Sequence, residues 1–176
     1  MNKHREIITL TNILIATTIL FYFVQINILY GNVLLGLNIY FFAEKLYYQP
    51  LSTMFAHGGL EHLAMNMIVL WQFGNLLEGY IGKIKFFIIY IFGGIITSIG
   101  TLVYIYYSSD FINVVGASGA ISVLMGYYAL KVKEDRKGIA VWILLISFVP
   151  LMFDIPVAWY AHLIGFAVGF IIGFVF

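Results

Sequence analysis

The chain contains no cysteine among its 176 residues. Disulfide bonds, thiolate metal sites and a cysteine nucleophile are therefore excluded. Charged residues are also scarce: they make up 10% of the chain, whereas soluble domains carry about 25%. So little charge does not cover a water-facing surface, and 62% of the residues are hydrophobic. These figures predict an integral membrane protein.

The net charge is close to balance, at +1. Basic residues are scattered between apolar runs and form no single patch, so we expect the lipid bilayer as a partner and no nucleic acid. The first apolar run, residues 7–30, follows Lys3 and Arg5 as in a signal peptide. It is longer than the roughly 7–15 residues of a secretory hydrophobic region, and no small-residue cleavage site follows it. We predict an uncleaved first span.

A helix that crosses a bilayer needs about 20 mostly apolar residues. Six segments are candidates, of which the fourth and fifth are short: residues 7–30, 60–77, 85–107, 118–130, 139–153 and 160–176. There is no internal repeat, low-complexity tract or separate soluble segment. The predicted fold class is therefore an all-α, polytopic membrane protein with a bundle of six transmembrane helices. We expect one domain over residues 1–176.

The distribution of basic residues predicts the orientation of these spans. With the N-terminus in the cytoplasm, only Lys45 among the nine lysines and arginines falls on the outer side. This strong bias follows the positive-inside rule and predicts that both termini are cytoplasmic. The small size and the lack of an organelle targeting region favour a bacterial cytoplasmic membrane.

Residues 31–59 are too long for a simple turn and too polar for a good span. They mix aromatic side chains with Glu44, Lys45 and Gln49. Such a mixture suits a hairpin or short helices at the membrane interface. An ordinary outer loop fits the composition equally well.

Polar residues gather where three of the predicted spans begin on the outer side. They are Glu61, His62 and Asn66 in the second span, Ser118 in the fourth and His162 in the sixth. Ionisable and polar residues inside a membrane are costly and are functional hypotheses by default. We expect these three ends to meet in one water-accessible pocket below the membrane surface.

Ser118 lies in the tetrapeptide Gly116-Ala117-Ser118-Gly119. Glycine removes side chains that would block an approach to the serine, and free N–H groups at a helix N-terminus stabilise an oxyanion. This pattern indicates a nucleophile. The alternative is that Ser118 only caps the helix and the glycines only allow close packing.

His162 is the one histidine of the last three predicted spans. Neutral imidazole is the usual base that activates a serine, whereas the alternative is a buried histidine bonded to a backbone carbonyl. Asp154 lies in the preceding loop and is not assigned a role, so a Ser118–His162 dyad is the simplest interpretation. Together these residues predict an intramembrane serine protease.

His62 and Asn66 are four residues apart, so on a helix they share one face. Both donate hydrogen bonds and suit an oxyanion hole. The alternative is a zinc site, because three histidines and a carboxylate, among them His57, His62 and Glu61, are ligand types for that metal. The metalloprotease pattern His-Glu-x-x-His is absent, however, and no metal or cofactor is expected.

Gly165, Gly169 and Gly173 recur every four residues in the sixth span. A smooth face of this kind lets a neighbouring backbone approach closely. We expect the sixth span to pack on the fourth and so bring His162 to Ser118. Plain helix packing without chemistry is the alternative.

The chain resembles the rhomboid family of intramembrane serine proteases, in its minimal six-span bacterial form. The matching motifs, in the family's order, are residues 57–66 (HGGLEHLAMN), 116–119 (GASG) and 161–169 (AHLIGFAVG). The resemblance implies that Ser118 is the nucleophile and His162 its base. It also implies an oxyanion hole of His62, Asn66 and the Ser118 N–H.

The same resemblance implies supporting roles and a substrate class. Gly116 and Gly119 flank the nucleophile, His57 has a more structural role, and Glu78 helps to hold the core together. Rhomboid proteases cut single-span membrane proteins near the outer membrane face and need no metal or cofactor.

Two other functions compete with the protease. A catalytically inactive rhomboid-like protein would bind membrane helices, but such members typically lose the serine or the histidine. A small transporter or channel would be expected to show an inverted repeat or broken helices, and the sequence has neither.

The chain departs from the family pattern at two places. Residues 48–55 contain no Trp-Arg pair, so the anchoring of the first loop is in question. Ser122 stands where some members carry an aromatic residue that stacks on the base. Support for His162 must therefore come from elsewhere.

Overall fold

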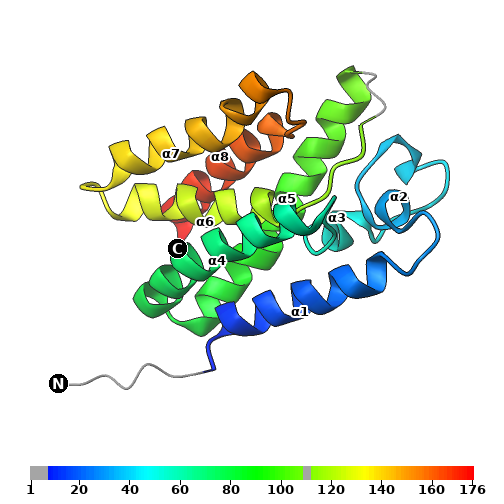
Figure 1. Cartoon of the computed structure of the whole chain (residues 1–176). Helices are drawn as coiled ribbons and strands as arrows, with labels where there is room; N and C mark the ends of the chain where they lie inside the picture. The colour runs from blue at the N-terminus through cyan, green and yellow to red at the C-terminus, as the bar shows by residue number, and fades with distance from the viewer. Residues whose placement is uncertain (1–7, 109–111) are drawn as a thin grey trace.

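The computed structural model describes residues 8–108 and 112–176 (Figure 1). Within these ranges the regular structure is helical, and the extended chain forms a single isolated antiparallel bridge, between Leu37 and Val114. The long helices are α1 (Leu10–Gln25), α4 (Leu60–Ile81), α5 (Lys83–Ser108), α6 (Ser118–Lys131), α7 (Arg136–Phe148) and α8 (Trp159–Val175). The short ones are α2 (Gly31–Leu35), η1 (Ile39–Phe41), α3 (Gln49–Ser52) and η2 (Pro150–Phe153).

Each predicted span corresponds to one long helix, but the first span was predicted too long. Helix α1 ends at Gln25, and the chain then turns through Tyr30, which has a positive φ of 57°. The prediction for residues 1–7 lies outside the described residues. In the fourth span α6 has 14 residues, as short as expected.

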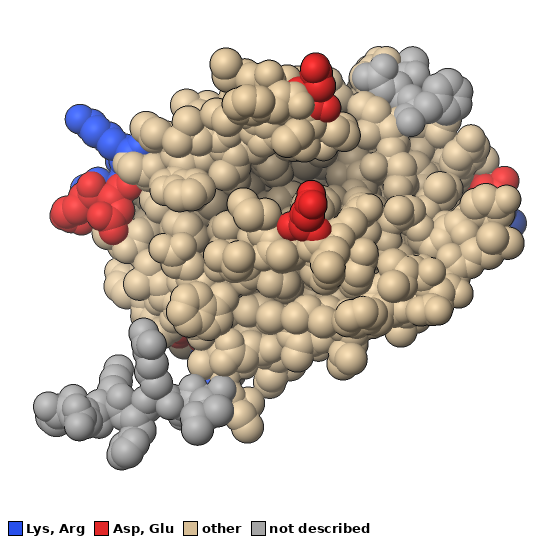
Figure 2. Space-filling model, in the orientation of Figure 1, with Lys and Arg blue, Asp and Glu red and all other residues tan. Residues whose placement is uncertain are grey.

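Two helical segments are long and apolar enough to cross a membrane by themselves: Lys83–Ser108 and Arg136–Phe153. Helices α1 and α8 are apolar but shorter, so the count of six spans stays a prediction. The surface agrees with an apolar environment, since α7 exposes Val141, Trp142 and Leu145. Figure 2 shows a broad face with few charged side chains, most of which lie toward its two ends.

Helix α6 is the centre of the bundle. It packs against α4, α5, α7 and α8, and Figure 1 shows it between α7 and α4. Most of its residues are small or apolar, and nine of the fourteen are buried. Because Ser118 is the first residue of this helix, the nucleophile candidate is attached to the most enclosed element of the fold.

The α6–α8 interface is formed by backbone lying against backbone. A Cβ atom added to Gly169 would lie 1.9 Å from the carbonyl oxygen of Val123. One added to Gly165 would lie 2.4 Å from the oxygen of Gly119, and one added to Gly126 would lie 2.0 Å from that of Phe166. None of these positions has room for a side chain. The prediction that the sixth span packs on the fourth through its glycines is therefore confirmed.

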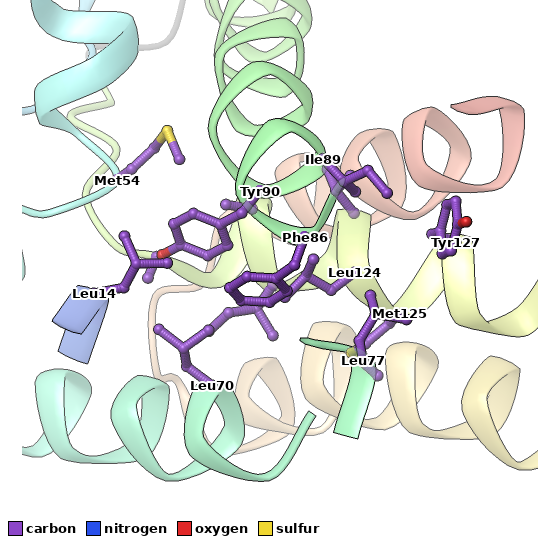
Figure 3. Packing of buried hydrophobic residues seen from close by; sticks show 14 of the residues in the cluster. Leu14, Met54, Leu70, Leu77, Phe86, Ile89, Tyr90, Leu124, Met125 and Tyr127 are labelled. Atoms are coloured by element: carbon purple, nitrogen blue, oxygen red, sulfur yellow. The ribbon is translucent and has the colours of Figure 1, made fainter. Parts of the chain in front are cut away.

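A cluster of large apolar side chains fills the other side of α6. Figure 3 shows Leu14 of α1, Leu70 of α4, Phe86 and Tyr90 of α5, and Leu124 of α6 in this cluster. All five are buried. The cluster ties four helices together and fixes the position of α4, which carries His62 and Asn66, relative to α6.

The α1–α4 interface has polar contacts at one end. The Glu78 carboxylate of α4 accepts hydrogen bonds from the N–H of Leu10 (2.9 Å) and from the N–H and hydroxyl of Thr11 (both 2.8 Å). A carboxylate at a helix N-terminus is stabilised by unpaired N–H groups and by the helix dipole. Glu78 therefore holds α1 on α4, as the family resemblance implied.

Three short helices, α2, η1 and α3, lie within residues 31–52, so the segment is not a plain loop. Their position at the membrane interface stays a prediction. The chain has no Trp-Arg pair here, and two side chains of α3 make three hydrogen bonds to α2 instead. The buried Gln49 amide donates to the carbonyls of Val33 and Leu34, at 3.2 Å each. The Ser52 hydroxyl donates to Leu35 at 2.8 Å. These bonds join α3 to α2.

Candidate functional site

Ser118 is held at the start of α6 by contacts made before the helix begins. The N–H of Gly116 donates to the Thr53 carbonyl (2.9 Å), and the Thr53 hydroxyl donates to the Val114 carbonyl (2.6 Å). The N-cap position belongs to Ala117, and no side chain caps the helix. The alternative that Ser118 is only an N-cap is therefore wrong.

The first N–H groups of α6 are free to bind a ligand atom. In the part of the chain that the structure describes, the N–H groups of Ser118 and Gly119 have no hydrogen-bond acceptor. Such donors at a helix N-terminus favour negative charge on a nearby oxygen. This is the local environment that an oxyanion hole requires.

Gly116 must be glycine for two reasons. Its φ is 128°, a conformation that L-residues rarely adopt. A Cβ atom here would also lie 2.8 Å from Cε1 of His62 and 3.7 Å from Oγ of Ser118. The imidazole of His62 therefore lies against the turn that carries Ser118.

His57 and His62 lie together beside this turn, with ring centroids 5.2 Å apart. His57 is fully buried; its Nδ1 lies 3.1 Å from the Phe55 carbonyl, and its Nε2 lies 3.5 Å from the N–H of Ala117. Burial, together with the charge of His62, lowers the pKa of His57 from 6.5 to about 4. A neutral ring that contacts the backbone next to Ser118 fits the structural role expected for His57.

Gln25 holds His57 in turn. The backbone N–H of His57 donates to Oε1 of Gln25 (2.9 Å), and Nε2 of Gln25 donates to the carbonyl of His57 (2.8 Å). Gln25 also donates to Asn32 of α2. We had not predicted a role for Gln25, although an amide at the end of an apolar span was a usable signal.

Asn66 lies one turn along α4 from His62 and is buried. Its Nδ2 donates to the carbonyl of His62 at 2.9 Å. A carboxamide carries two N–H groups, so a second donor remains for a ligand. Glu61, by contrast, is exposed.

His162 is the fourth residue of α8 and is 6% exposed. Its Nδ1 lies 3.2 Å from Oγ of Ser147 on α7. Within the described residues the ring contacts no backbone carbonyl, so the alternative of a carbonyl-bonded histidine is wrong. Sequence reasoning also missed Ser147, because a serine in an apolar helix is commonly satisfied by its own backbone.

Ser118 and His162 are neighbours through their helices but are not hydrogen bonded to each other in the described structure. Gly119, next to Ser118, contacts Gly165, one turn after His162. His62 lies beside His57 and against the Gly116 turn that precedes Ser118. The predicted residues therefore converge on the N-terminal ends of α4, α6 and α8.

A small cavity of about 20 Å³ adjoins Ser118. Gly116, Gly119 and Ala161 line it, together with hydroxyl-bearing residues of α5, namely Thr97, Ser98 and Thr101. A cavity of this volume holds about one water molecule. The wider pocket expected from the sequence is therefore small here. No group of three or more histidine, aspartate or glutamate side chains in the described residues is placed to hold a metal ion.

The chain matches the model of the Rhomboid domain over residues 44–176. The chain belongs to the rhomboid family. Proteins of this family are embedded in the membrane and act on transmembrane substrates, and generally they are serine intramembrane proteases. The matched range includes the candidate residues on α4, α6 and α8.

Several curated rhomboid proteins are similar to this chain. The rhomboid-family protein YdcA of Bacillus subtilis is 34% identical over 138 residues, which cover 73% of this chain and 66% of YdcA. Rhomboid protease GluP of the same organism is 34% identical over 95 residues, covering 54% of this chain and 18% of GluP. The human mitochondrial presenilin-associated rhomboid-like protein is 32% identical over 98 residues, which cover 55% of this chain and 26% of that protein. The matched segments thus make up two thirds or less of each relative.

Proposed function

We propose that this protein is an intramembrane serine endopeptidase that cleaves transmembrane segments of single-span membrane proteins near the outer membrane face. One observation carries the proposal. Ser118 begins α6, where its own N–H and that of Gly119 have no acceptor among the described residues, and α8, which bears His162, contacts α6 backbone against backbone at Gly165 and Gly169. The membership in the rhomboid family supports it.

The proposed reaction begins when the Ser118 hydroxyl attacks the scissile carbonyl and its proton passes to His162. The carbonyl oxygen becomes an oxyanion, which the Ser118 N–H, His62 and Asn66 stabilise. Collapse of this intermediate breaks the C–N bond, and His162 returns the proton to the leaving amine. Water then attacks the acyl-enzyme by the same route, releases the acid product and restores Ser118.

The ring nitrogen available for this proton transfer is Nε2, because Nδ1 of His162 faces Ser147. Ser118 and His162 are not hydrogen bonded to each other in the described residues. Catalytic hydrogen bonds are often long in free enzymes and shorten in the complex. We expect substrate binding to bring the two side chains together.

The proposed location follows from the charge distribution. Six spans with both termini in the cytoplasm leave the N-terminal ends of α4, α6 and α8 near the outer face. The site then meets substrate segments where they leave the bilayer. A bacterial cytoplasmic membrane is the proposed compartment.

A catalytically inactive, helix-binding rhomboid is the second candidate, because Ser118 and His162 are not hydrogen bonded to each other. The two candidates differ in one measurable property. An activated serine reacts with a fluorophosphonate probe, whereas a serine without a base does not.

The deciding experiment is therefore fluorophosphonate labelling of the full chain in detergent, combined with cleavage of a reporter transmembrane segment. We expect the probe to label Ser118 in the unsubstituted protein. Both labelling and reporter cleavage should be lost in S118A and in H162A. Chelators should leave the rate unchanged. The variant T18V, which removes a buried hydroxyl on α1, is the control for folding and should retain both signals. Cleavage that survives in S118A would show that the proposed function is wrong.

A further inference from the structure

Ser147 is a buried serine on α7 that the reaction described above does not use. It is fully buried, and its Oγ has two neighbours. One is the carbonyl oxygen of Ile143, four residues earlier in the same helix, at 2.6 Å. The other is Nδ1 of His162 on α8, at 3.2 Å.

These two contacts favour one arrangement of the hydrogens. A hydroxyl has one proton to donate, and a carbonyl oxygen only accepts. The short contact with Ile143 therefore uses the Ser147 proton, and Oγ accepts from His162 through a lone pair. Nδ1 must then carry a hydrogen. In a neutral imidazole this leaves Nε2 with the free lone pair.

We propose that Ser147 is the positioning residue for the base: its hydroxyl oxygen accepts the Nδ1–H of His162 and holds the ring in the tautomer whose Nε2 can take a proton from Ser118. This inference rests on the proposed protease function for its catalytic consequence. Its structural part, the tautomer, can be measured without any substrate.

The other candidates for this role are occupied or distant. Ser122 replaces the aromatic residue that stacks on the base in some family members, but its hydroxyl donates to the Ser118 carbonyl at 2.8 Å. Asp154 is exposed in the loop after η2 and makes no side-chain hydrogen bond among the described residues. Ser147 therefore provides the support for His162 that the sequence alone did not reveal.

A hydroxyl suits this position better than a carboxylate does. An unpaired charge buried in an apolar bundle is costly, whereas a hydroxyl with both of its hydrogen bonds made is not. The orienting effect is correspondingly smaller than that of the aspartate in a Ser-His-Asp triad, whose conversion to asparagine lowers kcat about 10⁴-fold. A neutral hydrogen bond contributes about 1 kcal/mol, which corresponds to a rate effect of about tenfold or less.

The first test measures the tautomer by ¹⁵N NMR of the full chain labelled at histidine, in detergent, with H162A used to assign the resonances. In the unsubstituted protein we expect a protonated Nδ1 and an unprotonated Nε2 on His162. In S147A we expect a mixture of the two His162 tautomers, with Nδ1 protonated in only part of the molecules. S147T keeps the hydroxyl and should keep the original spectrum. The same tautomer in S147A and in the unsubstituted protein would overturn the proposal.

The second test measures reporter cleavage by S147A and S147T. We expect kcat to fall about tenfold in S147A with KM unchanged, and S147T to recover most of it. T18V provides the matched control, because Thr18 is also buried and also donates to the carbonyl four residues earlier, at 2.7 Å, but lies on α1. A purely structural role for Ser147 predicts a lower melting temperature with kcat unchanged, and that result would contradict the proposal.

The two proposals fail in different ways. If cleavage persists in S118A, the protease assignment is wrong, yet the NMR spectrum of S147A still reports on the tautomer. If S118A is inactive while S147A keeps both the rate and the spectrum of the unsubstituted chain, only the role of Ser147 is wrong.

Discussion

Two helix pairs in this protein are held together in opposite ways. In the α6–α8 interface, glycines remove the side chains, and backbone atoms of one helix contact backbone atoms of the other. In the α1–α4 interface, Glu78 and Asn75 of α4 accept hydrogen bonds from the N-terminus of α1, and apolar side chains such as those of Leu14 and Leu70 pack in the same core. The candidate nucleophile and base lie on the first pair.

The two interfaces differ in how far their helices can shift relative to each other. Long side chains can change rotamer to absorb a small shift, whereas two contacting backbones cannot. Inside a membrane, where apolar burial gives no strong drive for association, close backbone packing is a main source of helix–helix stability. A Ser–His pair needs its geometry held within about 0.5 Å. Close backbone packing of α6 on α8 limits relative movement of the helices that carry the proposed Ser118–His162 pair, and the α1–α4 interface carries no such pair.

The variant that tests this comparison most directly adds a single methyl group to the α6–α8 interface. In G169A the new Cβ would lie 1.9 Å from the Val123 carbonyl oxygen, so the helices must separate. Overpacking of this kind costs about 1–3 kcal/mol or more. We expect a large fall in melting temperature and complete loss of reporter cleavage.

The matched control for this variant is G79A. Gly79 lies on α4, and a Cβ there would meet nothing within 4 Å. Melting temperature and rate should both stay near those of the unsubstituted chain. Equal damage from G79A and G169A would mean that helix flexibility, rather than close packing, explains the glycines.

The next largest effect, a fall in kcat, is expected from a change at Asn66. This residue lies on α4, but its proposed role is in the oxyanion hole beside Ser118 of α6. Removal of one oxyanion donor typically lowers kcat by about 10²–10³-fold. We therefore expect N66A to lower kcat about 100-fold with a stable fold. The comparison variant is N75A on the same helix. Asn75 also donates to the carbonyl four residues earlier, at 2.7 Å, and its Oδ1 accepts from the Thr9 hydroxyl at 3.0 Å, so N75A should lower the melting temperature but not kcat. A rate for N66A equal to that of the unsubstituted chain would remove Asn66 from the oxyanion hole.

In the α1–α4 interface the expected effect is on stability. E78Q replaces one carboxylate oxygen by an amide that faces donors, so at least one hydrogen bond of Leu10 or Thr11 is lost. Loss of a buried hydrogen bond costs about 1–3 kcal/mol. Melting temperature should fall, while kcat of the remaining folded protein should not.

The exposed Glu134 offers the control for this change, since E134Q alters the charge without altering a helix contact. The two interfaces would not differ as described if E78Q lowered kcat as strongly as a change in the α6–α8 interface does.

The smallest expected effect is on the stability of the folded protein at acidic pH. The pKa of His57 is about 4 in the folded protein, against 6.5 for an unperturbed histidine. Below pH 6.5 the unfolded chain therefore binds a proton that the folded chain resists, and stability falls as the pH drops from 6.5 toward 4. Thermal unfolding of H57Q should lose less stability between pH 7 and pH 5 than the unsubstituted chain. Equal losses would indicate that other groups determine the acid sensitivity.

Sequence reasoning located most of the candidate site but not its supports. Ser118, His62 and His162 were identifiable because polar groups in apolar spans are costly and therefore noticeable. Gly169 was identifiable from its four-residue spacing. Ser147 was not, because a serine satisfied by its own helix carries no visible cost.

Helix positions were also more predictable than helix ends. Length and hydropathy indicated each long helix. The end of α1 at Gln25, however, involves contacts with His57, which is distant in the sequence, and with Asn32, which follows the turn after α1. The anchoring of the first loop by Gln49 was likewise invisible, because its partners are backbone carbonyls of α2. Contacts of this kind depend on which segments meet, not on local composition.

By itself, the amino-acid sequence determined that this is an apolar helical protein of the rhomboid family, and it indicated which polar residues and which glycines are exceptional. These features are local, since each follows from the cost of one residue type in one environment. Only the tertiary structure decided that the hydroxyl of Ser147 faces Nδ1 of His162 and that Gln25 holds His57. Those pairs join separate helices, and the direction of a hydrogen bond between two helices depends on how the backbones pack.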